Sequence, residues 1–330
     1  MPNRMTNKIE ISHRTIIFTT LFLIGLWLLY EIRQILVALF VSLILMAAIN
    51  PAVDRLEKFR LPRWLAILVI YLVTIVVVGS MMAVMITPLI DQTASFINKS
   101  LFYLKDVGNL GIDPNVLASQ LSQLGSIPAN LLRLTMNFFS NLISIVALAF
   151  MTFYLLLERK NLTQYLTAVF GAEKEKEAIV VINGIEKRLG SWVRGELTLM
   201  VIIGLMSYIG LRLLGVEYAL PLAILAGLLE IIPNFGPIIS AIPAVLTGLM
   251  VSPMMALAIL ALYFLIQQSE NTLVAPKVMQ KVTGVNPLIT ILSLAIGFKL
   301  AGVSGAVLAI PVVLVIQEIA NWFLASKRSS

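Results

Sequence analysis

The chain has 330 residues and a net charge of +7, and 59% of its residues are hydrophobic while only 12% are charged. This composition is too apolar for a soluble globular domain and is typical of a polytopic membrane protein. The absence of cysteine excludes disulfides and thiolate sites, and the single histidine excludes a histidine-based metal site. We expect no enzyme, because the sequence offers no nucleophile–base pair, phosphate loop or metal cluster.

The positive charge is distributed in a way that indicates membrane topology. Basic residues concentrate in the loops at residues 55–63 and 159–194, and the C-terminal tail contains Lys327 and Arg328. The positive-inside rule therefore predicts that both loops and both termini are cytoplasmic. Basic residues do not alternate with aromatic residues as in a nucleic-acid groove, so we predict no nucleic-acid partner.

Long apolar runs predict α-helices in the first half of the chain. A helix needs about 20 residues to cross a membrane, and alternation with a period of two, which would indicate a barrel, is weak. No small-residue cleavage site follows the first run, so we predict a retained helix and not a signal peptide. The expected helices are 16–30, 34–50 ending at Asn50-Pro51, 64–87 ending near Pro88, and 138–157.

Two segments are amphipathic and are expected to lie outside the hydrocarbon core. Residues 89–137 are poor in basic residues and predict an external insert of two short helices, which would also suit packing between subunits of a homo-oligomer. Residues 158–196 predict a cytoplasmic amphipathic segment. A fifth membrane helix is expected at 197–214.

The C-terminal third, residues 219–323, is predicted to be a core of broken helices that carries transport. One arrangement has hairpins at 219–250 and 287–323, entering from opposite sides, with a single span at 254–268 between them. Broken helices of this kind are common in secondary transporters. The predicted fold is an all-α polytopic membrane protein with about 7–8 membrane helices or helical hairpins, two of them broken or re-entrant, as the spacing of the apolar runs suggests.

The first break lies in the stretch Glu230-Ile-Ile-Pro-Asn-Phe-Gly-Pro. Pro233 and Pro237 lack the N–H that a helix needs, Gly236 permits a sharp turn, and Asn234 adds an amide. A carboxylate at membrane depth costs about 2.5–3.5 kcal/mol, so Glu230 is expected to face a cavity, a partner or a proton path. The alternative is an interfacial loop with Glu230 near the headgroups.

Further polar residues lie near the predicted ends and breaks of the later helices. They are candidates for the same cavity, although an interfacial position explains several of them as well. The additional candidate site residues are Gln267, Glu270, Asn271, Lys299, Gly302 and Gly305.

Several of these motifs resemble the AI-2E transporter family. The resemblance rests on residues 230–237, on Glu270-Asn-Thr-Leu-Val-Ala-Pro, on Val285-Asn-Pro-Leu, and on Gly302-Val-Ser-Gly-Ala-Val-Leu-Ala-Ile-Pro. Trp192-Val-Arg-Gly-Glu before the fifth helix also belongs to it. Asn286 stands where a histidine is common in the family, which weakens any proposal of a histidine proton relay.

The resemblance implies a multi-pass transporter of the bacterial inner membrane. Some members export the signal autoinducer-2, and others are proposed to exchange Na⁺ or Li⁺ for H⁺. We predict export of a small polar metabolite, with autoinducer-2 as the first choice, Na⁺(Li⁺)/H⁺ antiport as the alternative, and a membrane scaffold as the third hypothesis. The expected partners are such a solute or a monovalent cation, membrane lipid and further copies of the chain, with no cofactor beyond coupled H⁺ or Na⁺.

Overall fold

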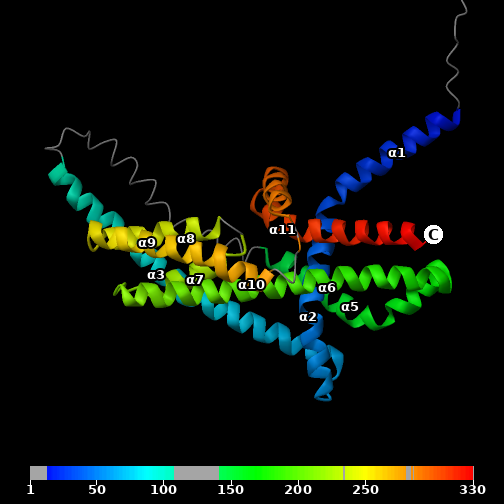
Figure 1. The fold of residues 1–330 in the computed structure, drawn as a ribbon, viewed down its shortest axis with the longest axis horizontal. Coiled ribbons are helices and arrows are strands. Elements are labelled where there is room, and N and C mark those ends of the chain that lie inside the picture. Colours follow the sequence, from blue (N-terminus) through cyan, green and yellow to red (C-terminus); the bar gives the residue numbers. More distant parts are fainter. Residues whose placement is uncertain (1–12, 108–140, 233–234, 280–283, 285, 330) are drawn as a thin grey trace, which may run out of the picture.

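The computed structural model describes residues 13–107, 141–232, 235–279, 284 and 286–329, which form helices and no strands (Figure 1). The predicted all-α membrane fold is therefore confirmed. Seven of the described helices are long and apolar enough to cross a membrane, and α7 and α8 are shorter. The elements are α1 (His13–Glu31), α2 (Arg33–Lys58), α3 (Arg63–Val107), α5 (Leu142–Glu158), the short η2 (Arg159–Asn161), α6 (Leu162–Leu213), α7 (Ala219–Leu229), α8 (Gly236–Leu249), α9 (Pro253–Ser269), the π-helical turn η3 (Glu270–Val274), α10 (Ala275–Met279) and α11 (Pro287–Ser329).

Two helix ends that the sequence placed at prolines were predicted wrongly. Helix α2 continues through Pro51 to Lys58, and α3 continues through Pro88 to Val107. A proline removes one hydrogen bond from a helix, but membrane helices tolerate it because neighbouring groups satisfy the freed carbonyl. Helix α3 therefore includes the first part of the predicted external insert, and residues 108–137 of that insert lie outside the described residues.

Most of the predicted cytoplasmic segment and the fifth membrane helix form one helix, Lys174–Leu213, within the element α6. Its only non-helical backbone is at Gly171, where φ is +79°. From Lys174 to Leu213 the helix has 40 residues, which gives a length of about 60 Å at a rise of 1.5 Å per residue. This is about twice the thickness of a hydrocarbon core, so part of α6 must extend beyond the membrane.

Helix breaks occur in the C-terminal third, as predicted. Helices α7 and α8 are separated by residues 230–235, and α11 is interrupted at Ala301 and Gly302, where Gly302 has a φ of +61°. The two parts of α11 cross at Gly297 and Gly305, and a Cβ on either glycine would collide with the carbonyl oxygen of the other. The lack of a side chain at these two positions therefore allows the tight hairpin.

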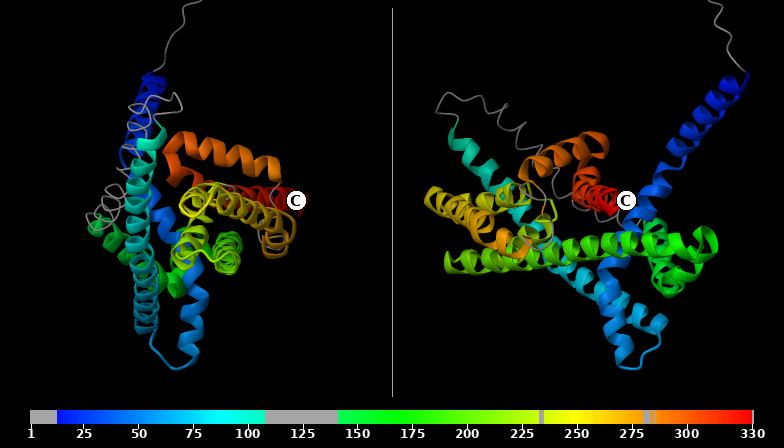
Figure 2. Two further views of the ribbon diagram at one scale, coloured as in Figure 1. Left: turned by 90° about the vertical axis from the view of Figure 1, so that its left-hand side faces the viewer. Right: turned by 45° about the vertical axis from the view of Figure 1, so that its right-hand side comes forward.

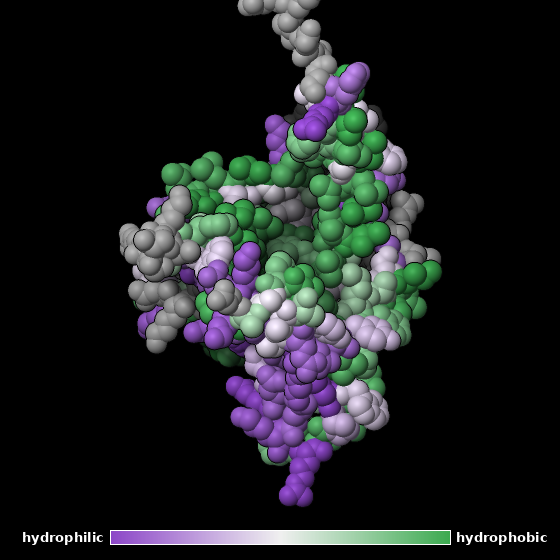
Figure 3. Space-filling view, turned by 90° about the vertical axis from the view of Figure 1, so that its right-hand side faces the viewer, coloured by the Kyte–Doolittle hydropathy of each residue, from purple (hydrophilic) through white to green (hydrophobic). Residues whose placement is uncertain are grey.

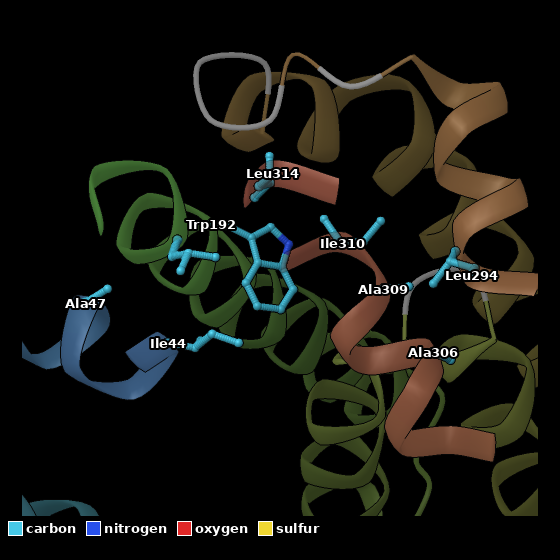
Figure 4. Packing of buried hydrophobic residues seen from close by; sticks show 9 residues of the cluster. Ile44, Ala47, Trp192, Leu294, Ala306, Ala309, Ile310 and Leu314 are labelled. Atoms are coloured by element: carbon cyan, nitrogen blue, oxygen red, sulfur yellow. The ribbon is translucent and has the colours of Figure 1, made fainter. Parts of the chain in front are cut away.

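Helix α11 is anchored to α6 through an apolar core around Trp192. Figure 4 shows the indole of Trp192 between Ile44 of α2 and Ile310 and Leu314 of α11. An ion pair at 2.6 Å between Arg188 of α6 and Glu318 of α11 reinforces this contact. By contrast, α1 has no buried residue and projects away from the other helices (Figures 1 and 2).

A polar network joins the ends of α2, α3 and α5. Arg63, whose side chain is only 9% exposed, binds Asp54 and Glu57 and also donates to the Leu156 carbonyl oxygen. Lys160 adds a second cation to Glu57. Figure 3 shows the hydrophilic residues gathered on the lower part of one face, where the turn between α2 and α3 lies, and apolar residues over most of the remainder.

Candidate functional site

Three glutamates from three different elements are buried together in the interior. Glu196 of α6 is 4% exposed, Glu230 at the end of α7 is 1% exposed, and Glu270 at the start of η3 is 5% exposed. The carboxyl groups of Glu230 and Glu270 are in hydrogen-bonding contact, and Glu196 is close enough to act electrostatically on both. We call these three residues the carboxylate cluster.

Close packing of α7 on α6 determines the position of Glu230. A Cβ on Gly227 would lie 2.6 Å from the Met200 carbonyl oxygen, and a Cβ on Gly204 would lie 3.3 Å from that of Ala223. Small residues at such positions let helix backbones approach closely. Glu230 follows Gly227 by about one helical turn, so this contact directs its carboxyl group toward the part of α6 that contains Glu196.

The π-helical turn η3 determines the position of Glu270. Helix α9 ends at Ser269, and Glu270 begins the five-residue π-helical turn. A π-helical turn changes the face on which the following side chains lie, and such turns are frequent at functional sites. Glu270 is buried while the next residue, Asn271, is exposed. Gln267, one turn earlier, donates from Nε2 to Glu270 Oε2 at 3.2 Å.

The carboxylate cluster lies far from the end of the bundle that contains the turn between α6 and α7. Glu196 is about 26 Å along its helix from Leu213, and Glu270 is about 26 Å from Pro253, at a rise of 1.5 Å per residue. By the same measure Glu230 is about 17 Å from Ala219. The three carboxyl groups are enclosed between helices and shielded from solvent, and the interfacial position of Glu230 stays an alternative prediction.

Among the described residues, no basic side chain forms an ion pair with the carboxylate cluster. The ion pairs found among the described residues involve Asp54, Glu57, Glu186 and Glu318. Glu196 Oε1 and Glu230 Oε2 are buried without a hydrogen-bond partner in that part of the chain. A buried charge without a partner is costly, and two carboxyl groups can form a hydrogen bond only if one of them holds a proton.

This arrangement is suited to binding and releasing protons. Within the described ranges, no set of three histidine or acidic side chains is placed to hold a metal ion. A multi-carboxylate metal centre therefore does not fit the described residues, whereas a proton shared by Glu230 and Glu270 requires only the contact that is present.

An apolar groove of about 790 Å³ runs between α8 and α9, and none of the three glutamates lines it. Among the lining residues, Gln267 also donates from Nε2 to Glu270 of the carboxylate cluster. Two buried polar atoms of lining residues have no hydrogen-bond partner among the described residues: the hydroxyl of Tyr263 and Oε1 of Gln267. Tyr263 is 5% exposed.

The structure brings together several of the site residues predicted from sequence. Glu230, Gln267 and Glu270 are in one place, and Gly236 and Pro237 are buried at the start of α8. Gly236 lies so close to the Leu229 carbonyl that a Cβ would collide with it. Pro233 and Asn234, which were also predicted, lie outside the described residues.

The other predicted site residues lie elsewhere. Lys299 is exposed near the tip of the α11 hairpin, together with Gly302 and Gly305, and α11 packs mainly against α6. The charges acting on Glu230 are those of Glu270 and Glu196. A role for Lys299 and the two glycines in binding therefore stays a prediction.

The sequence analysis missed Glu196 and Tyr263. Glu196 directly precedes the apolar run 197–214 and ends the motif Trp192-Val-Arg-Gly-Glu, which was a usable signal. Trp192, Leu199 and Ile203 are buried at helical spacing on the same side of α6, so Glu196 occupies a position where an apolar residue is expected. Tyr263 gave no such signal, because an aromatic residue in a membrane helix is ordinary.

Several known proteins are similar to this chain over most of its length. YueF of Bacillus subtilis is 27% identical over 290 residues, which cover 81% of this chain and 78% of YueF. The AI-2 transport protein TqsA of Escherichia coli is 25% identical, covering 86% and 85% of the two chains, and a sodium-lithium/proton antiporter of Halobacillus andaensis is 23% identical, covering 84% and 87%. The sequence model of the AI-2E family transporters matches residues 16–324. The chain therefore belongs to the AI-2E family of membrane transporters.

Proposed function

We propose that this transporter exchanges a monovalent cation, Na⁺ or Li⁺, for protons at the contact between Glu230 and Glu270. The observation that supports this function is a pair of touching, buried carboxyl groups with no basic partner among the described residues. The similarity to a relative named as a sodium-lithium/proton antiporter points in the same direction.

The exchange follows from electrostatics. With the site closed, the pair keeps a proton because two adjacent carboxylates repel each other in a low-dielectric interior. When the site opens to water, a monovalent cation replaces the proton as the compensating charge. When the site opens alternately to the two sides of the membrane, a gradient of one ion is converted into a gradient of the other.

Transport measurements on vesicles test this function. The purified chain would be reconstituted in liposomes with a pH-sensitive dye inside, and an imposed Na⁺ gradient should move protons in the opposite direction. Glu230→Gln keeps the side-chain volume but removes the exchangeable charge, so proton movement should fall to the level of empty liposomes. Glu217→Gln, at an exposed glutamate outside the cluster, should behave as wild type. Normal exchange by Glu230→Gln would disprove the assignment.

Export of a small polar solute such as autoinducer-2 is the second candidate. The relative named as an AI-2 transport protein supports it. Loading the same vesicles with autoinducer-2 and following its efflux separates the two functions. A scaffold role predicts no flux of either solute.

A further inference from the structure

Buried oxygen atoms without a hydrogen-bond partner gather along α6 and α9. Among the described residues, all but one of the buried side-chain polar atoms that lack a partner are oxygens of these two helices and of the glutamate that ends α7. They belong to Glu196 and Ser207 of α6, to Tyr263 and Gln267 of α9, and to Glu230. Leaving a buried polar group unpaired is costly, so each such group in a native structure calls for an explanation.

The packing of α6 against α9 brings these oxygens into one row. Gly195 of α6 faces α10, and Gly210 faces Leu262 of α9, with which a Cβ would collide. Because α10 follows α9 in the chain, the two helices run in opposite directions. Tyr263 directly follows Leu262, and Ser207 is about one turn from Gly210, so both lie within about one turn of the same contact.

The row leads from the carboxylate cluster toward the turn between α6 and α7. Gln267 donates from Nε2 to Glu270, so its unpaired Oε1 lies beside the cluster. Tyr263 is one turn farther along α9, or about 6 Å. On α6, Ser207 is about 17 Å and three turns from Glu196, which places both on the same face, and about 9 Å from the end of the helix.

Ser207 differs from the other buried hydroxyl groups of the described helices. Serine and threonine inside a helix usually donate to a carbonyl oxygen three or four residues earlier. Such bonds are made by Ser42, Thr152, Ser240 and Thr247. Ser207 is equally buried, at 0% exposed, but its hydroxyl makes no bond of this kind. It is therefore available to another oxygen or to an ion.

The chemistry of the row suits small hard cations and water. Such cations bind oxygen ligands, and the unpaired atoms of the row are all oxygens. The hydroxyl groups of Ser207 and Tyr263 both donate and accept hydrogen bonds, so they can also orient water molecules. A helix interface with only a packing role would need none of these groups.

We propose that monovalent cations and protons reach the carboxylate cluster along this row, between α6 and α9, from the end of the bundle that contains the turn between α6 and α7. The proposal rests on the exchange proposed above, which requires the cluster to open to water. It adds the route, with Ser207 and Tyr263 as lining residues. Access to the row can be measured without any transport.

A single introduced cysteine tests access to the row, because the chain contains no other thiol. Ser207→Cys replaces one oxygen by sulfur, and the full-length variant would be studied in lipid nanodiscs. Ag⁺ is similar in size to Na⁺ and reacts with thiols; the thiols left free are then counted with a fluorescent maleimide in detergent. We expect Ag⁺ to modify Ser207→Cys about ten times faster than Ser42→Cys, a control that is equally buried but lies on α2.

A second set of variants tests whether the route leads to the carboxylate cluster. Glu196→Cys places the thiol in the cluster itself. Adding Ser207→Leu fills the row and should slow the modification of Glu196→Cys by Ag⁺ about tenfold. Ser207→Val serves if the leucine variant has a much lower melting temperature. Adding Thr198→Leu, at an exposed position on the same helix, is the matched control and should leave the rate unchanged.

Each outcome decides a different point. Modification of Ser207→Cys no faster than that of Ser42→Cys would show a dry interface and overturn the proposal. Rapid modification of Ser207→Cys without protection of Glu196→Cys by Ser207→Leu would show that ions reach the cluster from elsewhere, and would overturn it too. If both expected results are obtained but Na⁺ moves no protons, the route stands and the proposed exchange is wrong.

Discussion

Replacement of Arg63 by methionine should destabilise the ends of α2, α3 and α5 together. The guanidinium group donates to the Leu156 carbonyl oxygen at 2.7 Å, to Glu57 Oε2 at 2.8 Å, to Asp54 Oδ1 at 2.9 Å and to Asn50 Oδ1 at 2.6 Å. Methionine retains most of the apolar stem but makes none of these bonds.

The expected loss follows from the exposure of each partner. The bond to Asp54, which is 50% exposed, contributes about 0–1 kcal/mol, because water competes with an exposed ion pair. The bonds to the Leu156 carbonyl and to Asn50 contribute about 1 kcal/mol each. Glu57 is 21% exposed and keeps Lys160, so its loss is also about 1 kcal/mol. The total is about 3 kcal/mol, which corresponds to a fall in melting temperature of roughly 5–10 °C for a chain of this size.

Thermal unfolding of the detergent-solubilised chain measures this change. Arg55→Met removes an exposed arginine from the same region and should leave the melting temperature nearly unchanged. Arg63→Lys should be intermediate, because lysine keeps the charge but cannot form the planar set of four hydrogen bonds. If Arg63→Met has the same melting temperature as wild type, the network does not hold these helix ends together and the hydrogen bonds of Arg63 do not contribute the expected stability.

Three further predictions concern the packing of the helices. Gly227→Leu should separate α7 from α6, because its side chain would meet the Met200 carbonyl, and we expect both a lower melting temperature and loss of ion exchange. Gly302→Ala forces a positive φ on a residue with a Cβ and should cost about 1–3 kcal/mol, measured by the same melting assay. Arg188→Glu should lower the free energy of unfolding by about 1 kcal/mol, because the ion pair with Glu318 is partly exposed. The double variant Arg188→Glu with Glu318→Arg should recover most of this loss. If it does not, the ion pair contributes nothing to stability.

Most of the fold was predictable because membrane helices are determined by long apolar runs. The errors occur where local rules compete with tertiary contacts. Pro51 and Pro88 predict helix ends from backbone chemistry, yet the helices continue through both. The break in α11 was predictable because Gly302 adopts a conformation that favours glycine, so local sequence and fold agree there.

The candidate site was predictable only in part. Glu230 and Glu270 stand out as carboxylates near apolar segments, but their contact joins residues 40 positions apart, and nothing in the local pattern indicates it. Glu196 enters the cluster through the packing of α7 on α6, which depends on the pair Gly204 and Gly227. Such contacts depend on the tertiary arrangement, and a single sequence contains no record of it.

Because α6 is long, a small tilt of this helix produces a large displacement at its ends. Glu196 and Arg188 lie on the same straight helix, about 12 Å apart at a rise of 1.5 Å per residue. Arg188 is bound to Glu318 of α11. A tilt of about 5° over the roughly 60 Å from Lys174 to Leu213 displaces the far end by about 5 Å. If α6 tilts as one body, the ion pair between Arg188 and Glu318 would carry the α11 hairpin with it, without a separate linking element.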